Sequence, residues 1–250
     1  MKVTIVGCSG SYPGPDSPAS CYLLEADGFR MVLDLGSGSL GALQRHIGLY
    51  DVDAICLSHL HADHCLDICG YHVARTYGPN APYPIVPVYA PADAPRRLAG
   101  AYGMPDEPGL ETAFEFVPLR PGSFEIGPFT LTAGLVNHPV EAYGFRVTNG
   151  RSSIAYSGDT GESQELVRLA AGTDLLLCEA SFVERPNLPP DLHLTGRQAA
   201  EHAAKAGVGR LVLTHLVPWN DQATVLEEAS TGGYAGPVEL ARSGAVYQLS

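Results

Sequence analysis

Three histidines and one aspartate occupy four of six consecutive positions in the chain: His59, His61, Asp63 and His64. Imidazole nitrogens and carboxylate oxygens are the ligands of catalytic zinc sites, which keep one coordination position open. An apolar run, Ala54–Leu57, leads into this motif and predicts a strand. His59 and His61, at its end, can face one metal ion, while Asp63 and His64 can turn toward a second. The alternative is a surface loop that is rich in histidine by chance.

Three further candidate ligands stand just beyond other apolar runs, namely His138, Asp159 and His215. Loops that follow strands gather at the edges of a sheet, where functional residues are commonly placed. A single His or Asp in such a position is usually a hydrogen-bonded polar group without further function. Four loops of the same design instead predict one shared metal site.

The elements that must position these residues are mostly strands. Short apolar runs alternate with turn-forming residues, which is typical of strands, and Asn149-Gly150 between two of them predicts a hairpin with a type I′ turn. The predicted strands are Val3–Val6, Cys21–Leu24, Arg30–Leu33, Ala54–Leu57, Ile85–Tyr89, Phe114–Val117, Phe129–Leu131, Tyr143–Val147, Ser153–Tyr156, Asp174–Cys178 and Arg210–Leu213.

Helical patterns are fewer. Thr195-x-x-Gln198 predicts a capping box that begins a helix ending at Gly207. An apolar stripe over Leu166–Ala170 predicts a shorter helix. Further helices are expected over Ser39–Ile47, Leu66–Tyr77 and Ala92–Tyr102. Strands in two groups, each accompanied by helices, indicate two packed sheets with helices outside.

The series HxHxDH, His, Asp, His resembles the metallo-β-lactamase superfamily. The resemblance implies an α+β fold, a four-layer αββα sandwich in a single domain spanning residues 1–250, with the metals at one edge of the two sheets. His61 favours hydrolysis, because superfamily members with redox iron often have Glu there. The ligand sets carried over by position are His59, His61 and His138 for one zinc ion, Asp63, His64 and His215 for the other, and Asp159 as the bridge.

Further segments are similar to actinobacterial proteins of this fold assigned as atypical class II cyclic-nucleotide phosphodiesterases. The same layout resembles ribonuclease Z, including a His-x-Thr loop matched by His193. Two features of ribonuclease Z are missing, however: the inserted arm that grips tRNA and the basic loop after the metal motif. The segments that carry the similarity are Cys8–Ser11, Gly14–Ser20, Gly41–His46, Cys178–Ser181, Pro189–Gly196 and Thr214–Trp219.

The implied reaction is hydrolysis of a small phosphodiester such as cAMP. The resemblance implies two divalent ions, with zinc as the favoured metal and manganese as the alternative. Their positive charges would exceed the negative charges of Asp63 and Asp159, so the site would stay cationic. Water bridging them would ionise near neutral pH and attack phosphorus in line. Asp63 and His193 are the predicted catalytic residues, with His193 as the acid that protonates the leaving 3′-oxygen; the alternative for His193 is a residue that only leads into the following helix.

Other positions have weaker indications. Asp34 is expected to fix a loop or orient a ligand from behind. Ser9–Ser11 could approach a phosphate through backbone N–H groups or simply form a tight turn. Cys65 and Cys69 are expected to pack rather than bind metal. Trp219, four residues beyond His215, could stack on a base.

Composition limits the partners. The formal net charge is −12, with 15 basic and 27 acidic residues and no basic cluster, which argues against a large polyanion such as nucleic acid. No apolar run is long enough to span a membrane. The start of the chain reads as a strand rather than a signal peptide, and the six cysteines suggest reduced thiols. These features predict a cytoplasmic protein, which could form a homodimer.

Three classes of function remain open from the sequence. The first is a cyclic-nucleotide phosphodiesterase. The second is another hydrolase of the same fold, either a ribonuclease Z-like endonuclease or an enzyme acting on thioesters or other esters. The third is a metal-binding or redox protein that hydrolyses nothing, for which metal analysis would find redox-active iron in place of two zinc or manganese ions.

Overall fold

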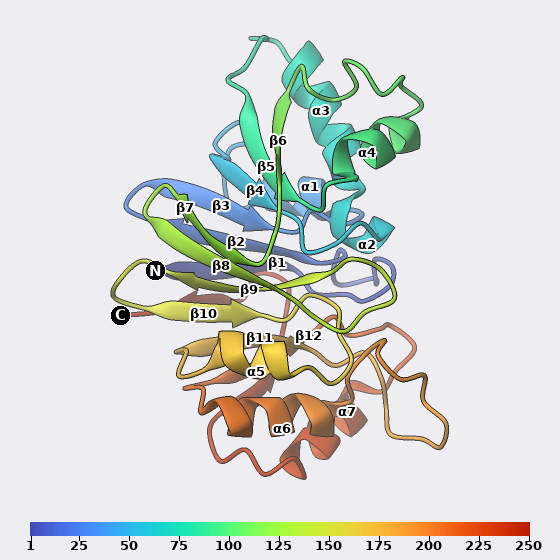
Figure 1. Ribbon diagram of the computed structural model, residues 1–250, viewed down its shortest axis with the longest axis vertical. Coiled ribbons are helices and arrows are strands. Elements are labelled where there is room, and N and C mark those ends of the chain that lie inside the picture. Colours follow the sequence, from blue (N-terminus) through green and yellow to red (C-terminus); the bar gives the residue numbers. More distant parts are fainter.

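The computed structural model describes residues 1–250 and contains two seven-stranded sheets. In the first sheet the strand order is β14-β1-β2-β3-β4-β5-β6. The outermost pair, β1 and β14, brings the two ends of the chain together, and both termini lie at the same side of the molecule (Figure 1). Its strands are β1 (Lys2–Gly7), β2 (Cys21–Ala26), β3 (Phe29–Leu33), β4 (Ala54–Cys56), β5 (Val86–Ala90), β6 (Phe114–Pro118) and β14 (Val246–Gln248).

The second sheet has the order β13-β12-β11-β10-β9-β8-β7. Strands β10 to β13 run parallel to one another, whereas β7 to β10 form an antiparallel meander. Its strands are β7 (Gly122–Ile126), β8 (Phe129–Leu135), β9 (Tyr143–Thr148), β10 (Ser153–Tyr156), β11 (Leu175–Glu179), β12 (Leu211–Thr214) and β13 (Val238–Leu240).

Seven helices cover the two outer faces, four on the side of the first sheet and three on the side of the second (Figure 1). None of them combines the length and the apolar character needed to cross a membrane. The helices are α1 (Ser39–Leu43), α2 (Ala62–Cys65), α3 (Asp67–Tyr77), α4 (Ala94–Tyr102), α5 (Gln164–Ala170), α6 (Gly196–Ala206) and α7 (Gln222–Ser230).

Three hydrophobic clusters fill the spaces between four layers. Alternate residues of a strand point to opposite faces of its sheet, so in β2 Tyr22 and Leu24 enter the cluster between the sheets while Leu23 enters the cluster beneath α1 and α3. The cluster between the sheets also contains Phe129 and Phe145 of the second sheet. Both halves of the chain therefore share one core, and the predicted four-layer αββα sandwich in a single domain is confirmed.

All eleven predicted strands are present, but three strands and two short helices were missed. Strands β7, β13 and β14 lie at sheet edges; β7 and β14 are largely exposed and β13 is half-buried, so their sequences lack the apolar runs of central strands. The helix α2 covers only four residues, and α7 buries only Val225 and Ala229 completely. The weak pattern of α2 therefore follows from its length, and that of α7 from how little of it is buried.

The hairpin between β9 and β10 is confirmed, whereas its predicted type I′ turn is wrong. Asn149 N–H donates to Ser152 O at 3.3 Å, so Gly150 and Arg151 are the central residues. Only Gly150 has a positive φ, at 81°, whereas a type I′ turn needs positive φ at both central positions. Asn149 instead uses its side-chain oxygen to accept the N–H groups of Arg151 and Ser152.

The predicted capping box of α6 is present. Thr195 Oγ1 accepts the N–H of Gln198 at 3.3 Å, and the Gln198 side chain accepts the N–H of Thr195 at 3.0 Å. The helix ends at Gly207, which has the left-handed conformation typical of this position. The cap fixes the start of α6 directly after His193.

Strand direction decides where functional residues gather. Strands β3 and β4 are parallel, as are β10, β11 and β12, so the carboxyl ends within each set meet at one edge. Ligand sites of sheets with parallel strands lie beyond these carboxyl ends. At the ends of these five strands, or within three residues beyond them, stand Asp34, His59, Asp159, Glu179 and His215, and they form the centre of the site described next.

Candidate metal centre

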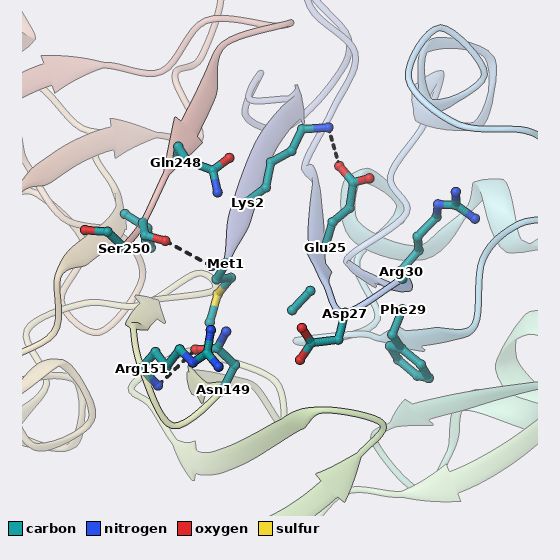
Figure 2. Close-up of a pocket in the computed structure, with 13 residues that line it drawn as sticks. Met1, Lys2, Glu25, Asp27, Phe29, Arg30, Asn149, Arg151, Gln248 and Ser250 are labelled. Carbon is teal, nitrogen blue, oxygen red and sulfur yellow. Dashed lines mark hydrogen bonds and ion pairs between the residues drawn. The ribbon is translucent and has the colours of Figure 1, made fainter.

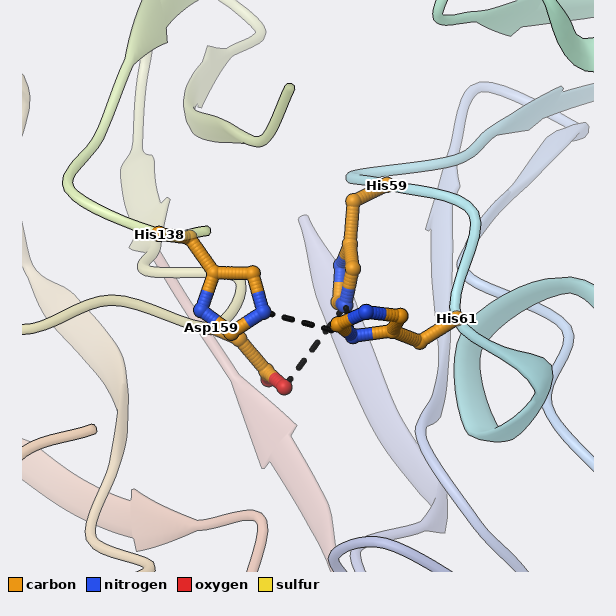
Figure 3. A group of neighbouring side chains, drawn as sticks. All are labelled: His59, His61, His138 and Asp159. Carbon is orange, nitrogen blue, oxygen red and sulfur yellow. Dashed lines mark hydrogen bonds and ion pairs between the residues drawn. The ribbon is translucent and has the colours of Figure 1, made fainter. Parts of the chain in front are cut away.

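The structure brings all seven predicted ligand residues to one edge of the sandwich, away from the chain termini. Four of them form a first group of donors, which Figure 3 shows pointing toward one another. His61 Nδ1 lies 3.0 Å from His59 Nε2 and 3.3 Å from His138 Nε2. The carboxylate of Asp159 completes the group, with Oδ2 3.6 Å from His59 Nε2.

A second group of donors lies beside the first and contains Asp63, His64, Asp159 and His215. His215 Nε2 is 3.0 Å from Asp63 Oδ2 and 3.4 Å from Asp159 Oδ2. His64 Nε2 is 3.1 Å from Asp159 Oδ1. Asp159 is thus the only residue shared by the two groups, because its carboxylate stands between them.

These residues fit a pair of metal ions. Tetrahedral zinc with ligands at 2.0–2.1 Å separates neighbouring donor atoms by about 3.3 Å, and the separations above fall around that value. Two buried atoms in the cluster, His64 Nε2 and Asp159 Oδ1, have no hydrogen-bond partner, which is costly unless another group satisfies them. Two ions held by the two groups, with Asp159 as the bridge, would satisfy both atoms.

The protonation states suit metal binding. Burial and the neighbouring imidazoles lower the pKa of His59 well below its usual range, which leaves the neutral ring that binds metals. Burial by itself would raise the pKa of Asp159, but the surrounding histidines hold it well below the usual range, so the carboxylate is ionised. Burial also acts to lower the pKa of His64, but the carboxylates on its two ring nitrogens raise it well above normal. The two carboxylates therefore stabilise a positive charge at His64 itself.

Asp34 fixes the metal-binding loop from behind, as the sequence predicted. His64 donates its Nδ1–H to Asp34 Oδ2 at 2.7 Å, which leaves Nε2 facing Asp159. The same carboxylate accepts the N–H of Ser58 at 2.6 Å and the hydroxyl of Tyr156 at 2.6 Å. Asp34 thus ties the loop after β4 to β10 of the other sheet.

Asp34→Asn is therefore expected to weaken metal binding about 10- to 100-fold, the usual effect of removing a carboxylate behind a histidine ligand. A competitive titration with a chromophoric chelator measures this change. Asp53→Asn serves as a matched control, because Asp53 also accepts a backbone N–H, from Arg30 at 2.8 Å, but lies outside the site. Equal metal affinity in both variants would contradict the orienting role of Asp34.

The sequence reading missed Glu179, which is fully buried and holds His193. His193 donates its Nδ1–H to Glu179 Oε1 at 2.8 Å, and Thr160 and Leu194 donate their backbone N–H groups to the same carboxylate at 2.7 and 3.2 Å. Burial lowers the pKa of His193, but Glu179 outweighs this effect and raises it to about 9. Glu179 therefore favours the protonated form of His193. The sequence signal for Glu179 was its position at the end of a buried strand, because the ligands also stand at or just beyond strand ends.

His193 lies against both donor groups without joining them. Its ring centre is 5.7 Å from that of His138 and 5.5 Å from that of His215. Glu179 and His193 are close enough to His215 to resemble a third donor group. However, the oxygens of Glu179 are already occupied by N–H and O–H donors, so this arrangement orients His193 rather than binding an ion.

The loop Ser9–Ser11 forms a tight turn, and its N–H groups are not available to a phosphate. Ser9, Gly10 and Ser11 donate their N–H groups to Pro18 O, Leu216 O and Asp63 Oδ2 at 3.1, 3.1 and 2.8 Å. A Cβ at Gly10 would lie 2.6 Å from the carbonyl oxygen of His215, so only glycine fits there. Of the two possibilities left open by the sequence, the structure supports the turn.

Cys65 and Cys69 pack beside the motif and do not face the metal centre. Both are buried, and their thiols point toward the backbone oxygens of His61 and Leu98. Burial raises the pKa of Cys65 to about 12, so the thiol stays protonated and is a poor metal ligand. Packing is the role that the sequence predicted.

Two cavities lie at opposite ends of the sandwich and differ in the residues that line them. The larger, about 540 Å³, lies at the end opposite the metal centre, between the termini and the β9–β10 turn (Figure 2). Its lining holds no histidine or cysteine, and Lys2 pairs with Glu25 there. The smaller, about 260 Å³, is lined by His193 and Trp219 and therefore adjoins the metal centre. We take the smaller cavity as the candidate substrate site, because it adjoins the candidate metal ligands and the larger one does not.

Comparisons with known proteins agree with this geometry. The protein Rv1339 of Mycobacterium tuberculosis is 45% identical over 245 residues, covering 95% of this chain and 88% of that protein. Ribonuclease Z of Streptomyces coelicolor is 30% identical over 295 residues, covering 96% and 95%. The crystal structure of the metallo-β-lactamase fold protein YhfI from Bacillus subtilis has a TM-score of 0.87 at 29% identity and covers 99% of each chain.

A family model described as a β-lactamase superfamily domain matches residues 32–216, which include all seven predicted ligands and both predicted catalytic residues. The sandwich, the relatives and the His/Asp clusters agree on a metallo-hydrolase. This chain belongs to the metallo-β-lactamase superfamily.

Proposed function

We propose that the protein hydrolyses a small cyclic nucleotide, with cAMP as the first candidate, using two divalent metal ions. One observation supports this most directly: His193, whose Nδ1 is bound by the Glu179 carboxylate, lies beside two donor groups that share Asp159. A ribose 3′-oxygen leaves as a strongly basic alkoxide, so its departure needs a proton donor as well as electrostatic stabilisation.

The residues divide the reaction between them. Two ions bound by the donor groups would ionise water near neutral pH and neutralise the phosphoryl oxygens. His193 uses Nδ1 to bind Glu179, so Nε2 is its only nitrogen free to deliver a proton. As the attacking oxygen bonds to phosphorus, the bond from phosphorus to the 3′-oxygen breaks and that oxygen takes the His193 proton. The product is a 5′-monophosphate.

The size and charge of the site favour a mononucleotide. The cavity of about 260 Å³ beside His193 suits one nucleoside rather than a folded RNA. The protein as a whole has a net charge of −12, which repels a long polyanion, whereas a single phosphodiester needs only the local positive charge of bound metals.

A ribonuclease Z-like activity is the second candidate, because the Streptomyces enzyme of that name is 30% identical over nearly its whole length. The two candidates differ in how they should respond to salt. Binding of tRNA by basic residues releases counterions and weakens steeply as salt rises. A singly charged diester held at a metal pair in a cleft should be much less sensitive.

We therefore expect metal-loaded protein to convert cAMP to AMP, with KM changing only a few-fold between about 50 and 200 mM salt. Little or no trimming of precursor tRNA is expected under the same conditions. Chromatography of the nucleotide products and gel analysis of the RNA measure the two activities. Efficient trimming of precursor tRNA by protein that leaves cAMP and cGMP intact would reject the cyclic-nucleotide proposal. Inactivity on both substrates would direct the search to other diesters and to thioesters.

A further inference from the structure

Trp219, the only tryptophan in the chain, is exposed beside the metal centre. Its side chain is 67% exposed, and the nearby Tyr12 is 44% exposed. The two rings pack at 5.6 Å between centroids with 36° between their planes. Large aromatic side chains left uncovered beside a catalytic cleft often mark a binding surface. Neither ring is used by the reaction proposed above.

Both aromatic residues are tied to the metal centre by short backbone links. Tyr12 follows Ser11, whose N–H donates to Asp63 Oδ2 at 2.8 Å. Trp219 follows His215 by four residues in a turn closed by the N–H of Asn220, which donates to Val217 O at 3.0 Å. The backbone position of each aromatic residue relative to the metal ligands is therefore held by these hydrogen bonds.

The cavity that Trp219 and His193 line has the mixed lining expected for a flat heteroaromatic ring. Phe182 and Val217 are apolar members of this lining, and Asn220 and Arg185 are polar ones. The Asn220 side-chain amide donates to Ser181 O at 2.7 Å, which fixes its orientation and leaves its own oxygen available as an acceptor. Because His193 lines the same cavity, a ligand there is in direct reach of the predicted acid.

The geometry points to a nucleobase-binding subsite in this cavity, with Trp219 as the stacking surface and Tyr12 supporting it. The inference rests on the proposed function only for the phosphate end of the ligand; the subsite itself recognises a base. A base stacked on Trp219 would place its ribose phosphate toward His193 and the donor groups. Purines are favoured, because stacking strengthens with the size of the ring system.

Binding can be tested without any reaction, because the single tryptophan reports directly on its own surroundings. Adenosine and AMP are expected to quench the fluorescence of the protein saturably, whereas ribose 5-phosphate, which has no base, should leave it unchanged. Tyr77→Ala is the matched control, since Tyr77 is 72% exposed on α3 and does not line the cavity. This variant should respond as the wild type does. If neither adenosine nor AMP changed the tryptophan emission, the proposed subsite would be rejected.

The kinetic test uses two substitutions at the same position. Trp219→Ala is expected to raise KM for cAMP about 5- to 150-fold, the range measured for single base–aromatic stacks, with a smaller effect on kcat. Trp219→Phe should recover most of that loss, because a ring remains. The side chain is largely exposed, so neither substitution should unfold the protein.

The outcomes separate the subsite from the proposed function. Saturable quenching by adenosine without hydrolysis of cAMP would uphold the subsite and reject the proposed reaction. Hydrolysis of cAMP with an unchanged KM in Trp219→Ala would reject the subsite and uphold the reaction. Quenching by ribose 5-phosphate equal to that by AMP would also overturn the subsite, because it would assign the binding to the phosphate.

Discussion

Asp159→Ala is expected to leave the protein with less than one metal ion per chain and without measurable hydrolysis. Asp159 is the only residue present in both donor groups, with its oxygens 3.6 Å from His59 Nε2 and 3.1 Å from His64 Nε2. Removing it takes a ligand and a neutralising charge from each group at once. Elemental analysis of the purified variant, alongside initial rates, measures both effects.

His138→Ala is the matched control for this experiment, because His138 belongs to the first donor group alone. It should lose the ion of that group and keep part of the metal in the second. The comparison therefore tests the bridge rather than the general need for ligands. If Asp159→Ala still held two ions per chain and turned over normally, the bridging assignment would be wrong.

His193→Ala is expected to keep its metal content while losing roughly 10²- to 10⁴-fold in rate on cAMP, the usual contribution of one positioned proton donor. The loss should be much smaller for a p-nitrophenyl phosphodiester, because p-nitrophenolate leaves without being protonated. Steady-state kinetics on the two substrates, together with elemental analysis, measure the difference.

His46→Ala controls for the loss of a histidine as such, since His46 lies beyond α1 and outside both donor groups. It should match the wild type on both substrates. An equal loss on both esters in His193→Ala would instead show that His193 positions the substrate without protonating the leaving group. Loss of metal in that variant would place His193 among the ligands.

The sequence by itself was sufficient for the candidate metal residues and for most of the fold. His59, His61, Asp63 and His64 are close in the chain, so their spacing already limits which chemistry they can share. Central strands such as β11 and β12 bury all their residues, and that burial is visible as apolar runs. The Thr195 capping box is also local, because all of its hydrogen bonds join residues three apart.

Only the tertiary structure decided features that join distant parts of the chain. Glu179 looked like the end of a strand until folding placed it 2.8 Å from His193, fourteen residues later. Tyr12 and Trp219 became a pair because the Ser9–Ser11 turn packs against His215 and Leu216. The edge strand β13 was missed because it has only three residues, all of them half-buried, which is too short for a recognisable apolar pattern. The apolar pattern of a segment indicates which of its residues are buried. Which distant residues it contacts depends on how the sheets and helices pack against one another.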